Sequence, residues 1–130
     1  MGFIWFRRVC TLLLCALLLV LFTLPSRYLT TRSAVWNAEI DTASAALQSG
    51  AFSAAQARTD ALASSFSDAK PALERFLHHD AVESVLAALM EAEVLCAVHD
   101  APGAIAALAA AKGGIEHLLC IERFTWNALL

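Results

Sequence analysis

Five side chains able to bind a metal or move protons fall in two short stretches of the C-terminal half. They are His79, Glu83, His117, Cys120 and Glu122. His79 and Glu83 are four residues apart, so on a helix they share one face. Imidazole, carboxylate and thiolate groups are all ligands that zinc accepts in proteins. If the two stretches belong to antiparallel helices that turn near Asp100, His79 lies opposite the region of Glu122, and the five groups gather at one end of a bundle.

A structural role accounts for the same side chains without a ligand. Asp80 and Glu83 have the spacing of a capping box, with aspartate in place of the usual serine or threonine. His78, His79 and His117 stand near predicted helix ends, where an imidazole can bond a terminal carbonyl. The sequence contains no metal-ligand motif, nucleophile elbow or phosphate-binding glycine loop. We therefore assign no catalytic, cofactor-binding or metal residue and expect a non-enzymatic chain. A metal-binding or sensory domain built on the His/Glu/Cys cluster is the alternative.

The N-terminal segment has the pattern of a membrane anchor. Arg7 and Arg8 precede an uncharged run, residues 9–24, which is 16 residues long. As a helix this run measures about 24 Å, which is short for a transmembrane helix and long for a signal-peptide core. Residues 3–6 add apolar length, and arginines can snorkel to the membrane surface. Because no A-x-A-like cleavage site follows, we expect a retained anchor that contacts the bilayer through residues 9–24. A cleaved signal and a secreted domain is the alternative.

The distribution of charge also separates the N-terminal segment from the rest of the chain. Residues 1–35 carry four arginines and no acid, whereas residues 36–130 carry five cations and twelve acids, a net charge of −7. Paired arginines after a short N-terminal tail usually stay in the cytoplasm, which places the acidic part on the extracytoplasmic side. An acidic domain repels phosphate backbones, so we exclude nucleic acid as a partner.

The chain after Pro25 predicts a small antiparallel bundle of about four helices. The first ends at Ser49-Gly50, a C-terminal stop signal. In the second, apolar residues alternate spacings of three and four from Phe52 to Phe76, which indicates bundle packing. Pro71 interrupts this seam, so we expect a kink or a new helix start at residues 67–68.

The third helix is expected to begin at Asp80, and the fourth to be capped by Asp100 with Pro102 in its first turn. The pair Gly113-Gly114 predicts a close helix crossing or a bend, because each glycine weakens a helix by about 1 kcal/mol. The residues expected in the core are Trp36, Ile40, Ala43, Leu47, Ala55, Thr59, Leu62, Phe66, Ala69, Leu73, Val82, Val85, Leu86, Leu89, Val94, Ile105, Leu108, Ile115, Leu118 and Leu119.

The C-terminal stretch 124–130 is too apolar to float free, and we expect it to dock onto the bundle. Trp126 would then seal the bundle and Asn127 would bond a helix end; a motif that inserts into a partner is the alternative. The antiparallel register places Cys96 near residue 105, about 22 Å from Cys120. Disulfide bonding requires Cα atoms within about 7 Å, so we expect no intramolecular bond, although Cys120 could link two copies.

Residues 50–55 and 100–105 are similar and each opens a helix, as in the hairpins of tetratricopeptide repeats. Other signature residues of that repeat are missing, so the simpler interpretation is two helical hairpins with the same turn chemistry.

The second half also resembles a known family. The residues that carry the resemblance are His79-Asp80-x-Val82-Glu83, Leu89, His99-Asp100, Ala104, Leu108, Ile115-Glu116-His117 and Glu122-x-Phe124-Thr-Trp126-Asn127-Ala-Leu-Leu130. This pattern resembles the bacterial domain-of-unknown-function family 4363, whose members are short, helical and membrane-anchored. The chain differs in its high alanine content and in lacking the usual lysine- and glutamate-rich middle. The resemblance implies architecture and membrane location, suggests a membrane partner, and implies no activity.

Together these patterns predict an all-α protein with two parts. Residues 1–28 form a cytoplasmic tip and a transmembrane signal-anchor, and residues 29–130 form an extracytoplasmic bundle of helical hairpins. We expect a single-pass accessory protein that interacts with a membrane or envelope protein. The sequence leaves the oligomeric state open.

Overall fold

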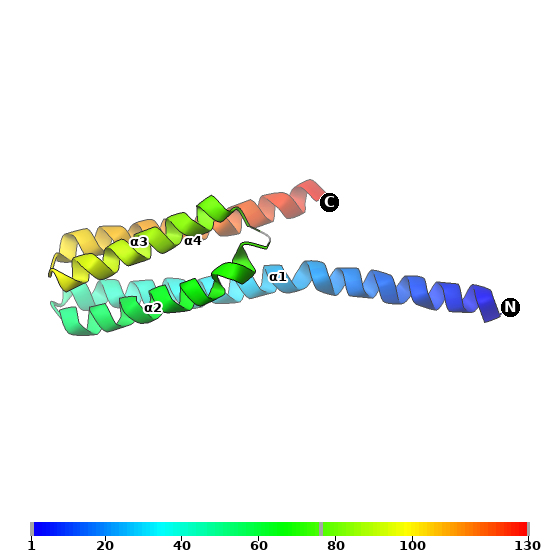
Figure 1. The fold of residues 1–130 in the computed structure, drawn as a ribbon, viewed down its shortest axis with the longest axis horizontal. Helices are drawn as coiled ribbons and strands as arrows, with labels where there is room; N and C mark the ends of the chain where they lie inside the picture. The colour runs from blue at the N-terminus through cyan, green and yellow to red at the C-terminus, as the bar shows by residue number, and fades with distance from the viewer. Residues whose placement is uncertain (1, 76, 130) are drawn as a thin grey trace.

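The computed structural model describes residues 2–75 and 77–129, apart from the side chains at positions 25, 26, 125, 126 and 129. Its four helices are α1 (Gly2–Gln48), α2 (Phe52–Leu73), α3 (His79–Ala97) and α4 (Ala101–Leu129), shown in Figure 1. Every regular element in the described ranges is a helix, so the predicted all-α class is confirmed.

Helix α1 joins the apolar run and the first bundle helix into one element of 47 residues. The anchor and the first helix of the bundle predicted from the sequence thus share one helix, which continues through Pro25. A proline inside a helix removes only its own backbone hydrogen bond. The bonds of the residues on either side can keep the helix continuous. Side-chain burial still changes along α1: almost all described residues up to Arg27 are exposed, and full burial begins at Leu29. The boundary at residue 28 stays a prediction.

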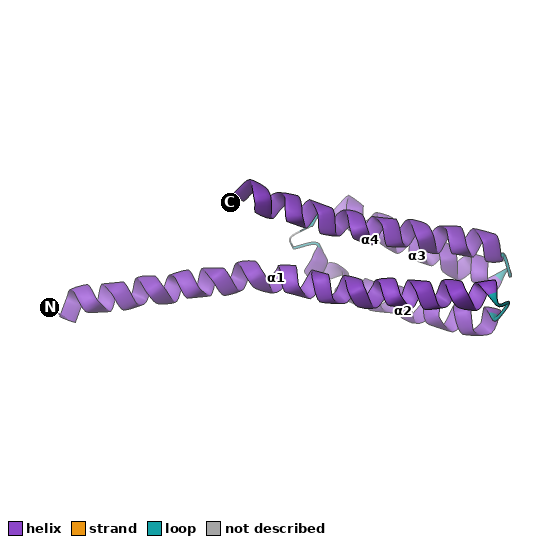
Figure 2. Ribbon diagram, turned by 180° about the vertical axis from the view of Figure 1, so that it is seen from behind, coloured by secondary structure: helices purple, strands orange, loops and turns teal. Residues whose placement is uncertain are grey.

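The bundle consists of the C-terminal half of α1 and the other three helices. Helix α1 packs against α2 and α4, and α3 packs against the same two helices, so α1 and α3 are diagonal to each other. The turns after α1 and α3 lie together at one end, which we call the distal end (Figure 2). Both chain termini point the other way, beyond the α2–α3 connection (Figure 1).

The core is centred on the edge-to-face contact of Trp36 and Phe66, whose ring centroids are 5.0 Å apart. The indole Nε1–H of Trp36 also donates to Ser65 Oγ at 3.3 Å. Of the expected core residues, all are buried except Leu86, Ile105 and Leu119, which pack partly buried against the core, and Val94. Val94 is 63% exposed because it lies on the outer face of α3, so that assignment is wrong. Phe76 lies outside the described residues.

Helix α2 is a single helix and ends at Leu73, two residues after Pro71. The new start expected at residues 67–68 does not occur. The last turn closes normally after the proline, with Glu74 N–H donating to the Lys70 carbonyl at 2.9 Å.

Both distal turns end their helices in the same way, but with Gly50 equivalent to His99 rather than to Asp100, with which the similarity of residues 50–55 and 100–105 pairs it. Gly50 has φ +79° and His99 has φ +60°, the left-handed conformation that terminates a helix. The residue after each donates its N–H across the turn: Ala51 to the Ala46 carbonyl and Asp100 to the Leu95 carbonyl, both at 2.9 Å. Asp100 then caps α4 as expected, accepting the Gly103 N–H at 3.1 Å.

A close approach of α3 explains one glycine of the pair in α4, Gly114. A Cβ at Gly114 would lie 2.7 Å from Val85 Cγ2, so the close crossing of α3 and α4 predicted from the pair is confirmed there. A Cβ at Gly113 would meet nothing within 4 Å.

The C-terminal stretch does not fold back onto the bundle. Helix α4 has 29 residues against 19 in α3, and its end continues past the α2–α3 connection (Figure 1). Phe124 is 75% exposed and Asn127 is exposed, so the expected docking of this stretch is wrong. The α-helix continues where a turn would have been needed to bring these residues back. The Trp126 side chain lies outside the described residues.

Candidate functional site

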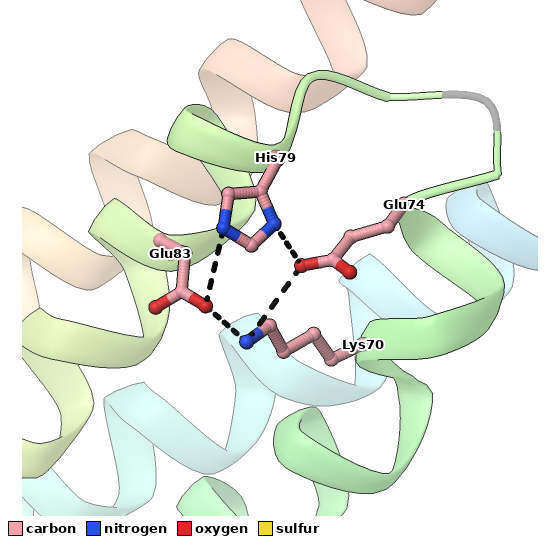
Figure 3. A network of polar contacts seen from close by, with 4 residues as sticks. All are labelled: Lys70, Glu74, His79 and Glu83. Carbon is pink, nitrogen blue, oxygen red and sulfur yellow. Dashed lines mark hydrogen bonds and ion pairs between the residues drawn. The ribbon is translucent and has the colours of Figure 1, made fainter.

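The polar residues with the closest mutual contacts form a cluster at the α2–α3 connection (Figure 3). We call Lys70, Glu74, His79 and Glu83 the connection cluster. His79 lies between two carboxylates, with Nδ1 2.6 Å from Glu74 Oε1 and Nε2 3.7 Å from Glu83 Oε1. The Lys70 ammonium bonds Glu83 directly and lies 3.7 Å from the same Glu74 oxygen.

The ends of two helices bring these groups together. Lys70 lies in the last turn of α2, where a cation interacts favourably with the helix dipole, and Glu74 is the residue that follows the helix. His79 begins α3, and Glu83 is one turn further along. Lys70 and Glu83 therefore join α2 to α3 at the end of the bundle opposite the two distal turns.

Charge neutralisation governs the electrostatics of this cluster. The hydrogen bond from Lys70, followed by its positive charge and that of His79, lowers the pKa of the Glu83 carboxyl against the opposing effect of burial. The same bond raises the pKa of the Lys70 ammonium, with further contributions from Glu74. Both groups are thus held in their charged forms, and neither is tuned toward proton transfer near neutral pH.

The predicted site residues separate into two groups. His79 and Glu83 are brought together, and Glu74 joins them as a third group with a ligand atom within 4.8 Å. His117 and Cys120 are exposed on α4, outside this group, and Glu122 is buried. The antiparallel register was correct, but it fixes only the level of a residue along the bundle and not the face on which it lies.

Sequence analysis missed Glu74 and Lys70. Their i,i+4 spacing at the end of a helix is a signal that could have identified them. The expected capping box of Asp80 and Glu83 is wrong, because α3 begins at His79 and Glu83 bonds Lys70 instead. His78 occupies the cap position and makes no side-chain capping bond.

A second polar contact joins the same two helices nearer the distal end. A hydrogen bond between the Asp60 and Glu93 carboxyls, together with burial and the negative charge of Asp60, raises the pKa of Glu93 to about 7. Next to it, the buried Cys96 thiol lies 4.0 Å from the Thr59 hydroxyl, which itself donates to the Ala55 carbonyl at 2.8 Å. Burial raises the pKa of the Cys96 thiol, so this cysteine is unreactive.

Two helices have the length and hydropathy of a membrane span. One is α1, whose most apolar window has mean hydropathy 2.5 and no buried residues; the other is residues 101–124 of α4, with mean hydropathy 1.5 and a third of the window buried. Helix α4 contributes Leu108, Ile115 and Leu118 to the core, which explains its apolar composition.

These features define a class of small all-α proteins, in which an antiparallel four-helix bundle continues from a long, exposed apolar helix. The chain belongs to the DUF4363 family, a domain of unknown function, whose family model matches residues 23–129. The match covers the whole bundle and confirms the resemblance seen in the sequence. Comparisons with curated proteins and with solved structures give no match.

Proposed function

We propose that this chain is a non-enzymatic accessory protein of the bacterial cell envelope. In this proposal α1 crosses the membrane through residues 9–24 and carries the bundle on the extracytoplasmic side, where it binds a membrane or envelope protein. The observation that carries it is the exposure of the apolar run. Fourteen large apolar residues from Phe3 to Leu24 are at least 44% exposed on one helix, an area that no other described part of the chain covers.

The bundle offers a surface for the protein partner on α3. Met90 and Val94 on α3 and Val98, the residue that follows it, are 54%, 63% and 66% exposed, and their spacing of four residues aligns them in a stripe along one face. Val94 is 15 residues from the start of α3, about 22 Å along the helix. A bilayer that holds residues 9–24 does not reach this height, so the partner of the stripe is a protein rather than lipid. Glu91 is exposed beside the stripe, which favours a basic surface on the partner.

A photo-crosslinking amino acid in place of Val94, in the full chain expressed in a bacterial host that encodes it, tests this surface. The matched control is the same substitution at Ala45, which is exposed on the diagonal helix α1. Each position lies three residues before the end of its helix at the distal turn. We expect one membrane protein to crosslink in stoichiometric amounts from position 94 and not from position 45. Equal crosslinking from both positions, or none from position 94, contradicts the proposal.

The intact mass of the purified chain tests the anchor separately. An unprocessed N-terminus in the membrane fraction supports a retained anchor. A chain that begins after the apolar run, recovered outside the membrane, supports the alternative of a cleaved and secreted helical protein.

A metal-binding domain is the second candidate, and the geometry of Glu74, His79 and Glu83 favours it. Two carboxylate oxygens and one imidazole nitrogen within 4.8 Å of one another match the ligand types of zinc. Lys70 opposes metal binding, because its ammonium already bonds one carboxylate and lies close to the other. The cluster can therefore hold either the lysine or a divalent cation.

Zinc titration of the full chain by calorimetry distinguishes these states. If the cluster is a metal site, Lys70→Met tightens zinc binding at least tenfold and His79→Ala abolishes it. If neither variant binds zinc, the connection cluster is a structural ion-pair network. Arg58→Met, which removes an exposed ion pair with Glu39 elsewhere on the bundle, is the control.

A further inference from the structure

Helices α1 and α4 leave the bundle at the same end. On α1 full burial begins at Leu29, and on α4 Glu122 is buried at 9% exposure. Beyond these points most described side chains of both helices are exposed, including Arg123 and Phe124 on α4, while Tyr28 and Val9 on α1 are partly buried. The end of α4 and the emerging part of α1 extend in the same direction, past the α2–α3 connection (Figures 1 and 2).

An ion pair fixes the register between these two helices. Lys112 Nζ on α4 lies 2.9 Å from Asp41 Oδ1 on α1. Because the helices are antiparallel, twelve residues onward from Lys112 lead to Phe124, and twelve residues back from Asp41 lead to Leu29. Phe124 is therefore level with Leu29, and the end of α4 is level with Leu24, the last residue of the apolar run.

This level corresponds to the headgroup layer of a bilayer that contains the run. Leu29 is five residues, about 7.5 Å, beyond Leu24 along α1. The headgroup region on each side of the hydrocarbon core is about 5–7.5 Å thick, so Phe124 is level with its outer edge and the residues after it lie within it. Phenylalanine side chains on interfacial helices insert at the boundary between headgroups and acyl chains, and arginine side chains are attracted to anionic lipid headgroups. Arg27 on α1, three residues beyond Leu24, is exposed in the same layer and adds positive charge there, and Arg32 is exposed about 12 Å beyond Leu24 along the helix.

We propose that the C-terminal end of α4 is a second membrane contact, in which Phe124 inserts into the headgroup layer and Arg123 binds lipid phosphates of the bilayer spanned by α1. This inference rests on the proposed function, because it requires that α1 is embedded. It also accounts for an apolar segment that the bundle leaves uncovered: Phe124 is 75% exposed on the protein and becomes covered by lipid. With two helices attached, the long axis of the bundle stands along the membrane normal.

Depth-dependent quenching in nanodiscs tests the contact with the full chain. A fluorescent amino acid replaces Phe124, Val98 or Leu14 in three separate proteins. Val98 is the matched control, an apolar residue 66% exposed at the distal end, and Leu14 reports on the anchor itself. The bilayer is phosphatidylcholine with phosphatidylglycerol, carrying nitroxides either at the headgroup or in the middle of the acyl chain.

We expect headgroup nitroxides to quench position 124 at least twofold more than position 98, and acyl-chain nitroxides to quench position 14 most strongly. Adding Arg123→Glu should reduce the quenching at position 124 without changing the thermal melting temperature, because the side chain is exposed. Strong quenching at position 14 with positions 124 and 98 alike would overturn the second contact and keep the anchor. Absence of quenching at position 14 would overturn the anchor, and this inference with it.

Discussion

The rings of Phe52 and His99 stack with centroids 4.5 Å apart and planes inclined by 23°, which joins the two distal turns of the bundle. His99 is thus held in a left-handed conformation that costs a non-glycine residue about 1–2 kcal/mol. Gly50, at the equivalent place in the other turn, avoids that cost. The backbone strain at His99 is thus offset by its ring contact with Phe52 of the other helical hairpin.

His99→Gly should therefore change the free energy of unfolding little, because relief of strain is offset by loss of a ring contact worth about 0.5–1.5 kcal/mol. In a Phe52→Ala background the contact is already lost, so His99→Gly should stabilise by about 1 kcal/mol. Urea denaturation of the four proteins in a mild detergent gives the comparison. An equal effect of His99→Gly in both backgrounds would mean that the stacking contributes nothing.

Adjacent glycines in α4 should respond to alanine in opposite directions. Gly113→Ala should raise stability by about 0.5–1 kcal/mol, because the site is open and alanine favours the helix. Gly114→Ala should lower stability by about 1–3 kcal/mol, because its Cβ would lie 2.7 Å from Val85 Cγ2. Thermal melting measures both. Val85→Ala should remove the penalty at position 114, and a persistent penalty would place the clash elsewhere.

Stability should fall as the pH rises through the range in which Glu93 titrates. Its pKa in the folded chain, about 7, lies above the ordinary value of 4.5, so folding favours the protonated carboxyl. The associated stability is present in full below pH 4.5 and is lost as the pH rises to about 7. Melting temperatures of the wild type at pH 5.5 and pH 8 show the change.

Glu93→Gln should flatten this dependence and make the chain more stable than the wild type at pH 8. Glu91→Gln, an exposed change two residues away on α3, is the control and should leave the profile unaltered. A profile for Glu93→Gln that matches the wild type would assign the pH dependence to other groups.

The two cysteines of the bundle should differ in reactivity. Cys120 is exposed and should be alkylated in the native chain, whereas Cys96 is fully buried and should react only on unfolding. Peptide mass mapping after maleimide treatment separates them. If Cys120 links two copies, non-reducing gels show a dimer that Cys120→Ser removes; equal mobility with and without reductant contradicts the cross-link.

The sequence was sufficient to predict the bundle because the apolar spacing is regular in each helix. It predicted the Asp100 cap, which depends on local chemistry, and the close approach of α3 and α4 at Gly114, for which a glycine pair inside a helix is a local signal. It failed where the outcome depends on geometry between helices. The side that Val94 occupies, the pairing of Glu83 with Lys70 and the direction taken by α4 after Glu122 are decided by neighbours distant in the chain.

The continuity of α1 has a consequence for orientation. Because α1 is one continuous helix, inserting one residue between positions 24 and 29 would turn the bundle by about 100° around the anchor axis and raise it by about 1.5 Å. Because α3 is diagonal to α1, the outer face of α3 would then point in a different direction around that axis. A helix turn corresponds to about 3.6 residues, so inserting four residues leaves the bundle about 40° from its original orientation, and inserting seven leaves it about 20° away. The number of residues in α1 therefore sets both the rotational orientation of the bundle around the anchor axis and its height above the membrane.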